Sequence, residues 1–236
     1  MKYFSRNILF IITVLLASCV ATSPIGSQKR ADEVPMYGGL DRSQTYDLRA
    51  ADDKFISDVT QQYGSREKAG RVWVEQGFKF YQQDNLGMAM RRFNQAWLLD
   101  PANPEVYTGF SSVLHDQGKN CEAKQMMEKA LNLNPPPFQG IYPDAARIFT
   151  LCAVSDKALA PTAKEDLIAR SEALYKKAEE LEPNKKYVYS SWATAYYWRG
   201  QYAEAWTMVA KERALGGKPG EKFLSLLRTK MAEPEK

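Results

Sequence analysis

A pattern of large and small apolar residues recurs along the chain with a period of 34 residues. Counted from Gly70, the order is large, small, large, small, large, small and proline, at positions 4, 8, 11, 20, 24, 27 and 32. Apolar residues spaced in this way predict amphipathic helices, and a fixed period predicts a repeat architecture. The residues at these positions are Trp73, Gly77, Phe80, Ala89, Phe93, Ala96 and Pro101 in the first unit, and Tyr107, Ser111, Leu114, Ala123, Met127, Ala130 and Pro135 in the second.

Each unit is expected to form two antiparallel helices joined by a polar turn. The stretches QQDN and HDQGKN supply the turns. The proline at position 32 ends the second helix, because it has no N–H to donate. Small residues at positions 8 and 20 let the paired helices approach closely, and the large residues fill the space beside that contact. The chain is therefore predicted to be all-α.

The pattern continues toward the C-terminus in a distorted form. A third unit is predicted from helices at about 143–154 and 163–182, separated by a longer connection. A fourth unit follows from about 186 and lacks the final proline. One further helix is expected at 52–63, closed by a glycine, and another within 218–236. Such flanking helices would cover the apolar ends of a repeat array.

The two regular units resemble the tetratricopeptide repeat family, and the resemblance covers about 70–215. It implies a right-handed superhelical stack of about four helical hairpins, with a capping helix at each end, in one domain over 51–236. Neighbouring hairpins must stack because none can cover its own apolar face.

The first 19 residues differ from the rest of the chain. Lys2 and Arg6 precede an apolar run over 8–16, which is too short for an ordinary transmembrane helix. The run predicts a secretory signal.

The sequence LASC at 16–19 resembles the lipobox of bacterial lipoproteins. This resemblance implies a signal peptide over 1–18 and acyl chains such as palmitate on Cys19; the alternative is an ordinary signal peptide with an incidental cysteine. Val20, where an aspartate would favour the inner membrane, points to the outer membrane, with the domain facing the periplasm.

Residues 19–50 are predicted to hold the acylated cysteine and a flexible tether. They are rich in Ser, Thr, Pro, Gly and charged residues and show no sustained period. Such a segment buries too little apolar surface to offset the entropy of ordering. MYGGL at 36–40 is the exception, since its apolar residues could dock on the domain.

The charge and motif content argue against catalysis and nucleic-acid binding. Lys plus Arg exceed Asp plus Glu by 32 − 28 = 4, and Lys2 and Arg6 lie in the segment expected to be removed. The mature chain is then close to neutral, without a basic footprint. His115 is the only histidine, and the HxxxH, CxxC, GxSxG and P-loop patterns are absent. No catalytic residue, cofactor, metal or small-molecule substrate is expected.

The family resemblance also implies a binding groove, because positions 2, 5, 9 and 12 of each first helix line a concave surface in tetratricopeptide repeats. The Lys and Asn pattern of the carboxylate clamp is absent, so an extended peptide or a partner helix is expected. The alternative is that these side chains pack against the terminal segments or MYGGL. Carried onto this sequence, the lining is Arg71, Val74, Phe78, Tyr81, Thr108, Ser112, His115, Tyr142, Ala146, Phe149, Tyr187, Ser190, Thr194 and Tyr197.

Two further cysteines are placed to pair in a fold of this kind. Consecutive helices run antiparallel, so Cys121 at the start of one helix and Cys152 at the end of the next lie at the same edge. In the oxidising periplasm a disulfide is expected, closing a loop of about 32 residues. The alternative is two separate buried thiols.

Together these features predict an outer-membrane-anchored periplasmic adaptor or scaffold that serves envelope assembly through protein–protein contacts. The alternative is a structural or surface-displayed lipoprotein without a dedicated groove ligand. An enzyme is a distant third.

Overall fold

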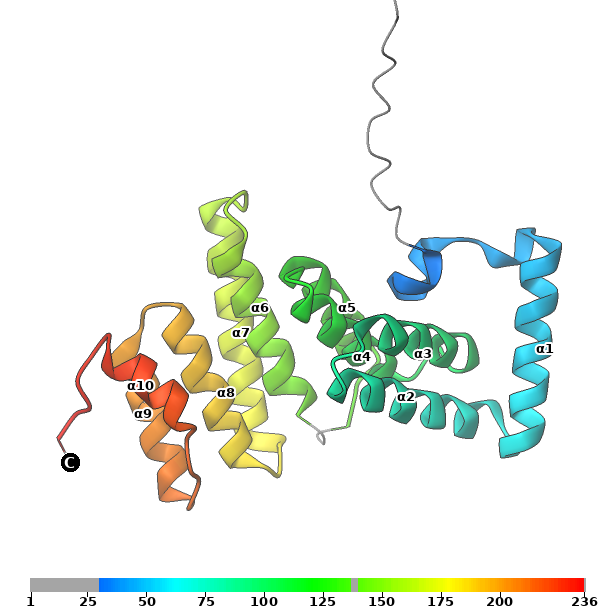
Figure 1. Cartoon of the computed structure of the whole chain (residues 1–236). Coiled ribbons are helices and arrows are strands. Elements are labelled where there is room, and N and C mark those ends of the chain that lie inside the picture. The colour runs from blue at the N-terminus through cyan, green and yellow to red at the C-terminus, as the bar shows by residue number, and fades with distance from the viewer. Residues whose placement is uncertain (1–29, 137–139, 236) are drawn as a thin grey trace, which may run out of the picture.

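The computed structural model describes residues 30–136 and 140–235, and within these ranges the chain is all-α with no strand (Figure 1). The prediction of an all-α chain is thus confirmed for these residues. Three short 3-10 helices come first: η1(Ala31–Glu33), η2(Pro35–Gly39) and η3(Arg42–Gln44). The α-helices follow: α1(Tyr46–Tyr63), α2(Arg66–Gln82), α3(Leu86–Leu99), α4(Pro104–Asp116), α5(Asn120–Asn132), α6(Ile141–Ser155), α7(Pro161–Leu181), α8(Lys185–Trp198), α9(Tyr202–Ala214) and α10(Glu221–Arg228).

The helices pack as successive hairpins. Helix α2 packs on α3, α4 on α5, α6 on α7 and α8 on α9, and each hairpin contacts the next. Helix α2 also packs on α4, and α6 on α8, so first helices of neighbouring hairpins lie side by side (Figure 1). The predicted helices at 143–154 and 163–182 correspond to α6 and α7. The C-terminal helix was predicted within 218–236 and corresponds to α10, which begins at Glu221 and ends at Arg228.

Side chains at the turns explain where the helices begin. The side-chain oxygens of Ser65, Asn85, Asn103 and Asn184 accept hydrogen bonds from backbone N–H groups in the first turns of α2, α3, α4 and α8. These bonds satisfy donors that have no partner within the helix. Pro104 occupies the first turn of α4, where no N–H is required. The repeated stops and restarts in the sequence are therefore helix ends with local caps.

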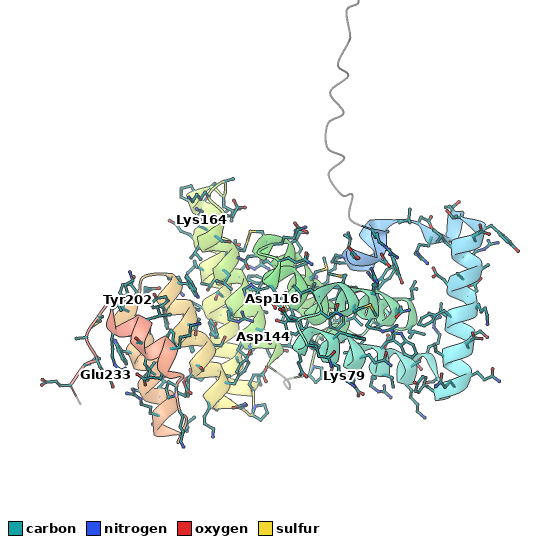
Figure 2. All side chains as sticks on the ribbon, in the orientation of Figure 1. Lys79, Asp116, Asp144, Lys164, Tyr202 and Glu233 are labelled. Atoms are coloured by element: carbon teal, nitrogen blue, oxygen red, sulfur yellow. A yellow bond between two sulfur atoms is a disulfide. The ribbon has the colours of Figure 1, made fainter. Side chains whose placement is uncertain are left out.

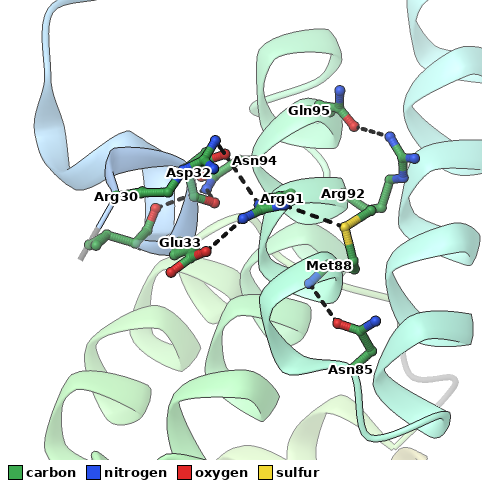
Figure 3. A network of polar contacts seen from close by, with 10 residues as sticks. Arg30, Asp32, Glu33, Asn85, Met88, Arg91, Arg92, Asn94 and Gln95 are labelled. Atoms are coloured by element: carbon green, nitrogen blue, oxygen red, sulfur yellow. Dashed lines mark hydrogen bonds and ion pairs between the residues drawn. The ribbon is translucent and has the colours of Figure 1, made fainter. Parts of the chain in front are cut away.

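The segment over 31–44, here called the docking segment, lies against the helices: η1 and η2 pack on α3, and η3 packs on α1 (Figure 3 shows the contacts of Asp32 and Glu33). Asn94 of α3 is fully buried, and its side chain makes three hydrogen bonds to the backbone of the docking segment. The Asn94 side chain accepts from the N–H of Tyr37 at 3.1 Å and donates to the carbonyls of Asp32 and Val34 at 3.0 and 2.9 Å. Because an amide buried in this way costs free energy unless its bonds are made, the three contacts fix the segment in one place.

Charged and aromatic contacts secure both ends of the docking segment. Arg91 of α3 forms ion pairs with Glu33 at 2.6 Å and with Asp32 at 3.2 Å (Figure 3). Arg42 pairs with Asp52 of α1 at 2.6 Å and lies 4.2 Å from the ring centroid of Tyr37. The aromatic ring is thereby held between α1 and α3.

These contacts correct the predicted domain boundary. The flexible tether expected over 19–50 does not hold for residues 31–50, and α1 begins at Tyr46 and not at 52. The docking of MYGGL over 36–40 agrees with the prediction, since Tyr37 is buried and Met36 packs against the core. The predicted signal peptide and Cys19 lie outside the described residues.

The predicted disulfide is present. Cys121 in the first turn of α5 is bonded to Cys152 near the end of α6, with the two Cα atoms 4.7 Å apart. The bridge joins the second hairpin to the third.

Candidate partner-binding surface

The side of the stack formed by α2, α4, α6 and α8, here called the inner surface, carries a row of polar contacts. Arg147 of α6 lies at its centre and donates to His115 of α4 at 3.2 Å and to Asp144 at 3.4 Å. Asp144 in turn accepts a 2.5 Å hydrogen bond from the hydroxyl of Tyr187 on α8. Asp144 and Asp116 mark this row in Figure 2. Three first helices are thus tied together by side chains alone.

The bonds of His115 define its tautomer. A guanidinium can only donate, so the Nε2 of His115 accepts from Arg147. The Nδ1–H then donates to the side-chain oxygen of Asn120 at 2.8 Å, and Asn120 donates to the Oγ of Ser155 at 3.2 Å. The histidine therefore links α4 to α5 and α6.

Two tyrosines at the ends of the row keep their protons. Burial raises the pKa of Tyr81 to about 12, with a hydrogen bond and the charge of Asp116 acting in the same direction. Burial, followed by the carboxylate of Asp144, also raises the pKa of Tyr187. Both hydroxyls are donors throughout the physiological range, so the row holds its geometry there.

A hollow of about 360 Å³ opens at the α2 end of the inner surface. Phe78, with the edge of Val74, forms its apolar wall, and its polar lining combines the cations Arg71 and Lys79 with the carboxylates Glu75 and Glu105. Both cations are exposed, and Phe78 is partly exposed. The ring of Phe78 is held edge-on against Phe93 with the centroids 5.1 Å apart. An apolar wall with charged groups of both signs at its rim suits a peptide that places an apolar side chain between polar neighbours.

Five of the predicted groove residues are buried. The exposed fractions are 1% for Val74, 8% for Thr108, 5% for Tyr142 and 0% for Phe149; Ala146 is also buried. Val74 contributes only the edge of the hollow. The prediction was wrong for α6 because the irregular third unit shifts the helix phase.

The phase of α6 is visible from its contacts. Arg170 and Lys177 of α7 lie over the rings of Phe149 and Tyr142, so these rings face α7 and not the inner surface. Asp144, two positions after Tyr142, and Arg147, two positions before Phe149, face the inner surface instead, where they contact Tyr187 and His115.

The remaining predicted positions are divided between surface and structure. Arg71 and Phe78 line the hollow, and Tyr81, His115 and Tyr187 take part in the polar row. The hydroxyls of Ser112 and Thr194 bond to carbonyls one turn back in their own helices, at 3.0 Å each, and Ser190 hydrogen-bonds the buried carboxyl of Glu212.

Tyr197 is covered by the C-terminal helix. Its ring lies 5.9 Å from Phe223 of α10 and 5.8 Å from Tyr202, measured between ring centroids. The alternative that groove aromatics pack on terminal segments is therefore correct for Tyr197. It does not hold for MYGGL, which lies on α3.

Sequence reasoning missed Asp116, Asp144 and Arg147. The signal available for the last two was their spacing, because a carboxylate and an arginine three residues apart mark one polar face on the otherwise apolar α6. Asp116 could not be found in this way, since its role depends on contact with α2.

Within 30–136 and 140–235, no group of three or more His, Cys, Asp or Glu side chains is placed to hold a metal ion. No helix in this part of the chain combines the length and apolar character needed to cross a bilayer. Searches of protein-family models and of curated proteins found no match to this chain.

Proposed function

We propose that this protein is an adaptor of the tetratricopeptide type, whose hairpins form a right-handed superhelix and whose inner surface binds an extended segment of another envelope protein. The observation that carries the proposal is the continuous inner surface: four first helices contribute side chains to one row, and a hollow with an apolar wall and charged residues at its rim opens at its end. A rigid surface of this kind favours peptide binding, because little ordering is required on the protein side.

The bound segment is expected to place an apolar side chain in the hollow beside Phe78. An acidic group next to that side chain would pair with Lys79, which follows Phe78 directly, or with Arg71, two turns before it on α2, while a basic group would pair with Glu75 or Glu105. The polar row farther along offers tyrosine hydroxyls and carboxylates for backbone and side-chain hydrogen bonds. A structural lipoprotein without a groove ligand is the competing function, because the row also satisfies its own hydrogen bonds.

We further propose that the chain is anchored through an acylated Cys19 in the outer membrane and faces the periplasm. Ten residues lie between Cys19 and Arg30, so the eleven steps from one to the other would span at most about 40 Å at full extension. The docking segment lies on the α3 side of the stack, which leaves the inner surface uncovered (Figure 1). An anchor on that side is compatible with partner binding on the other.

Capture of a partner in cells tests the adaptor function. Mild cross-linking followed by mass spectrometry should recover one stoichiometric envelope protein with the unaltered chain. Phe78→Ala and Tyr81→Ala should each reduce the recovery, because buried aromatic anchors typically contribute about 2 kcal/mol, or roughly thirtyfold in affinity. Lys79→Glu should weaken capture with no loss of helicity, since the ammonium is exposed.

Lys68→Glu is the matched control for this experiment, because Lys68 is an exposed lysine on α2 that does not line the hollow. Equal recovery from Lys79→Glu and unaltered protein, or recovery of bulk lipoproteins only, would favour the structural alternative. If Phe78→Ala and Tyr81→Ala unfold the chain, the aromatics are core residues.

Anchoring gives a separate prediction. Cys19→Ser should leave the protein unprocessed or released from the membrane fraction, while circular dichroism of the helical domain stays unchanged. The reason is that acylation needs the thiol, whereas the helices over 46–228 pack through contacts with one another. Intact-mass measurement of the mature protein is the readout. An unacylated N-terminus at any other residue would contradict the lipoprotein assignment.

A further inference from the structure

The third hairpin projects past its neighbours and creates a step on the surface. Helix α7 has 21 residues, whereas α8 has 14 and α5 has 13. The joined ends of α6 and α7 therefore extend beyond the end of α8, and Lys164 marks the projecting part in Figure 2. At the step, the C-terminal end of α8 meets the side of this longer hairpin.

The step contains a hollow of about 490 Å³ that lies apart from the inner-surface hollow. Trp198 at the end of α8 is 54% exposed, and Val154 at the end of α6 is 38% exposed. A tryptophan this exposed is uncommon in a folded protein, because its large apolar surface is normally buried. The hollow is lined by Ala153, Val154, Lys164, Ile168, Trp198, Arg199 and Gln201.

The indole of Trp198 is held in position although it is exposed. Its ring packs edge-on against Tyr197, with centroids 5.6 Å apart, and Tyr197 in turn packs on α10. The apolar wall opposite is Val154 with the partly buried Ile168. A flat side chain or a long aliphatic one would fit between these walls with little rearrangement.

The two cations of the hollow differ in their partners. Arg199 forms an ion pair with Glu172 and lies over the ring of Tyr196 at 5.0 Å, so its charge is already matched. Lys164 has no ion pair or side-chain hydrogen bond to any residue in the described ranges. The charge that remains for a partner is therefore a single ammonium at the rim.

We propose that this hollow is a second docking site, which takes a partner segment with a large apolar side chain followed directly by a carboxylate. The apolar side chain lies on Trp198, facing Val154 and Ile168, and the carboxylate pairs with Lys164. An exposed ion pair contributes at most about 1 kcal/mol, so the apolar contact supplies most of the affinity. Lys164 adds specificity for a segment that carries the carboxylate.

Fluorine NMR of the full-length chain in mild detergent tests this site directly. The chain has five tryptophans, so 5-fluorotryptophan labelling should give five signals, and Trp198→Phe identifies the one that matters. The probe is the capped dipeptide acetyl-Phe-Asp-amide, at concentrations that would saturate a site with a dissociation constant of about 1 mM. The Trp198 signal should move saturably while the other four stay in place.

Matched probes and variants separate the contributions. Acetyl-Phe-Asn-amide should bind about threefold to fivefold more weakly, because it lacks the charge. Acetyl-Ala-Asp-amide should bind too weakly to saturate. Lys164→Gln should make the Asp and Asn probes equivalent, whereas Lys157→Gln, at an exposed lysine of the same hairpin end outside the hollow, should change nothing.

Three outcomes would overturn the proposal. The first is a Trp198 signal that does not respond to acetyl-Phe-Asp-amide. The second is equal binding of the Asp and Asn probes to the unaltered chain. The third is a Trp198 signal that shifts with protein concentration alone, which would show that a second copy of the chain covers the hollow.

Discussion

Replacing Gly109 with alanine is expected to destabilise the fold by about 2 kcal/mol, although alanine is the better helix former by about 1 kcal/mol. A Cβ at this position would lie 2.3 Å from the Cε1 of Phe93, far inside van der Waals contact. Gly77 faces the same ring from the other side, where a Cβ would lie 2.4 Å from the same atom. The ring of Phe93 thus fills the space that two glycines leave between α2, α3 and α4.

The ring of Phe93 cannot move aside to relieve the contact. It is fully buried, with Phe78 and Phe110 against it at centroid distances of 5.1 and 6.2 Å. Close-packed interiors transmit such overlap into neighbouring side chains and backbone. Gly109→Val should therefore cost more than Gly109→Ala, and in chemical denaturation the midpoint should fall in that order.

A double variant and a control make this prediction specific. Phe93→Leu alone should destabilise the protein, but Gly109→Ala combined with Phe93→Leu should cost less than the sum of the two, because the smaller side chain removes the overlap. Gly87→Ala in α3 should be neutral or stabilising, since an added Cβ there meets nothing within 4 Å. Additive costs in the double variant would show that the overlap is relieved elsewhere.

The packing around Phe93 also shows why the regular part of the fold was predictable. Gly77 and Phe93 stand at positions 8 and 24 of the first unit, where the sequence pattern demands one small and one large residue. The two residues of such a pair lie in the same hairpin and are close in sequence. The prolines and asparagines at the helix ends also act on the helices next to them. The spacing of these residues therefore predicts α2 to α5 closely, and α6 and α7 to within two residues at each end.

The features that could not be predicted depend on contacts between distant segments. Asn94 has the appearance of an ordinary helix residue, and only the presence of the docking segment about 60 residues earlier explains its burial. The prediction of which α6 residues face the inner surface was wrong, because the repeat positions of the family were counted across an irregular connection. One helical residue corresponds to 100° of rotation, so a shift of two positions exchanges buried and exposed faces.

Breaking the Cys121–Cys152 bond is expected to lower the free energy of unfolding by about 3 to 4 kcal/mol. The two residues are 31 positions apart, and the loop between them includes the end of the second hairpin and nearly all of α6. Cross-linking so long a loop removes many conformations from the unfolded chain. For a domain of about 200 residues, this corresponds to a fall of about 6–16 °C in the thermal midpoint.

Reduction and substitution together isolate the contribution of the covalent bond. A reductant acts on the unaltered chain without removing either sulfur, whereas Cys121→Ala with Cys152→Ala removes both. The reduced chain should melt far below the oxidised one, and the double variant should not respond to reductant at all. Non-reduced peptide mapping should find positions 121 and 152 linked in protein taken from the periplasm.

Loss of the bridge should also have a local signature. The bond holds the end of α6 against the start of α5, at the junction between the regular second hairpin and the irregular third one. Hydrogen exchange of the reduced chain should therefore increase first in α6 and the adjoining start of α7, while α2 and α3, whose packing around Phe93 does not involve the bridge, keep their protection. Uniform loss of protection would indicate that the hairpins unfold as one cooperative unit, and an unchanged thermal midpoint would show that packing alone holds the third hairpin.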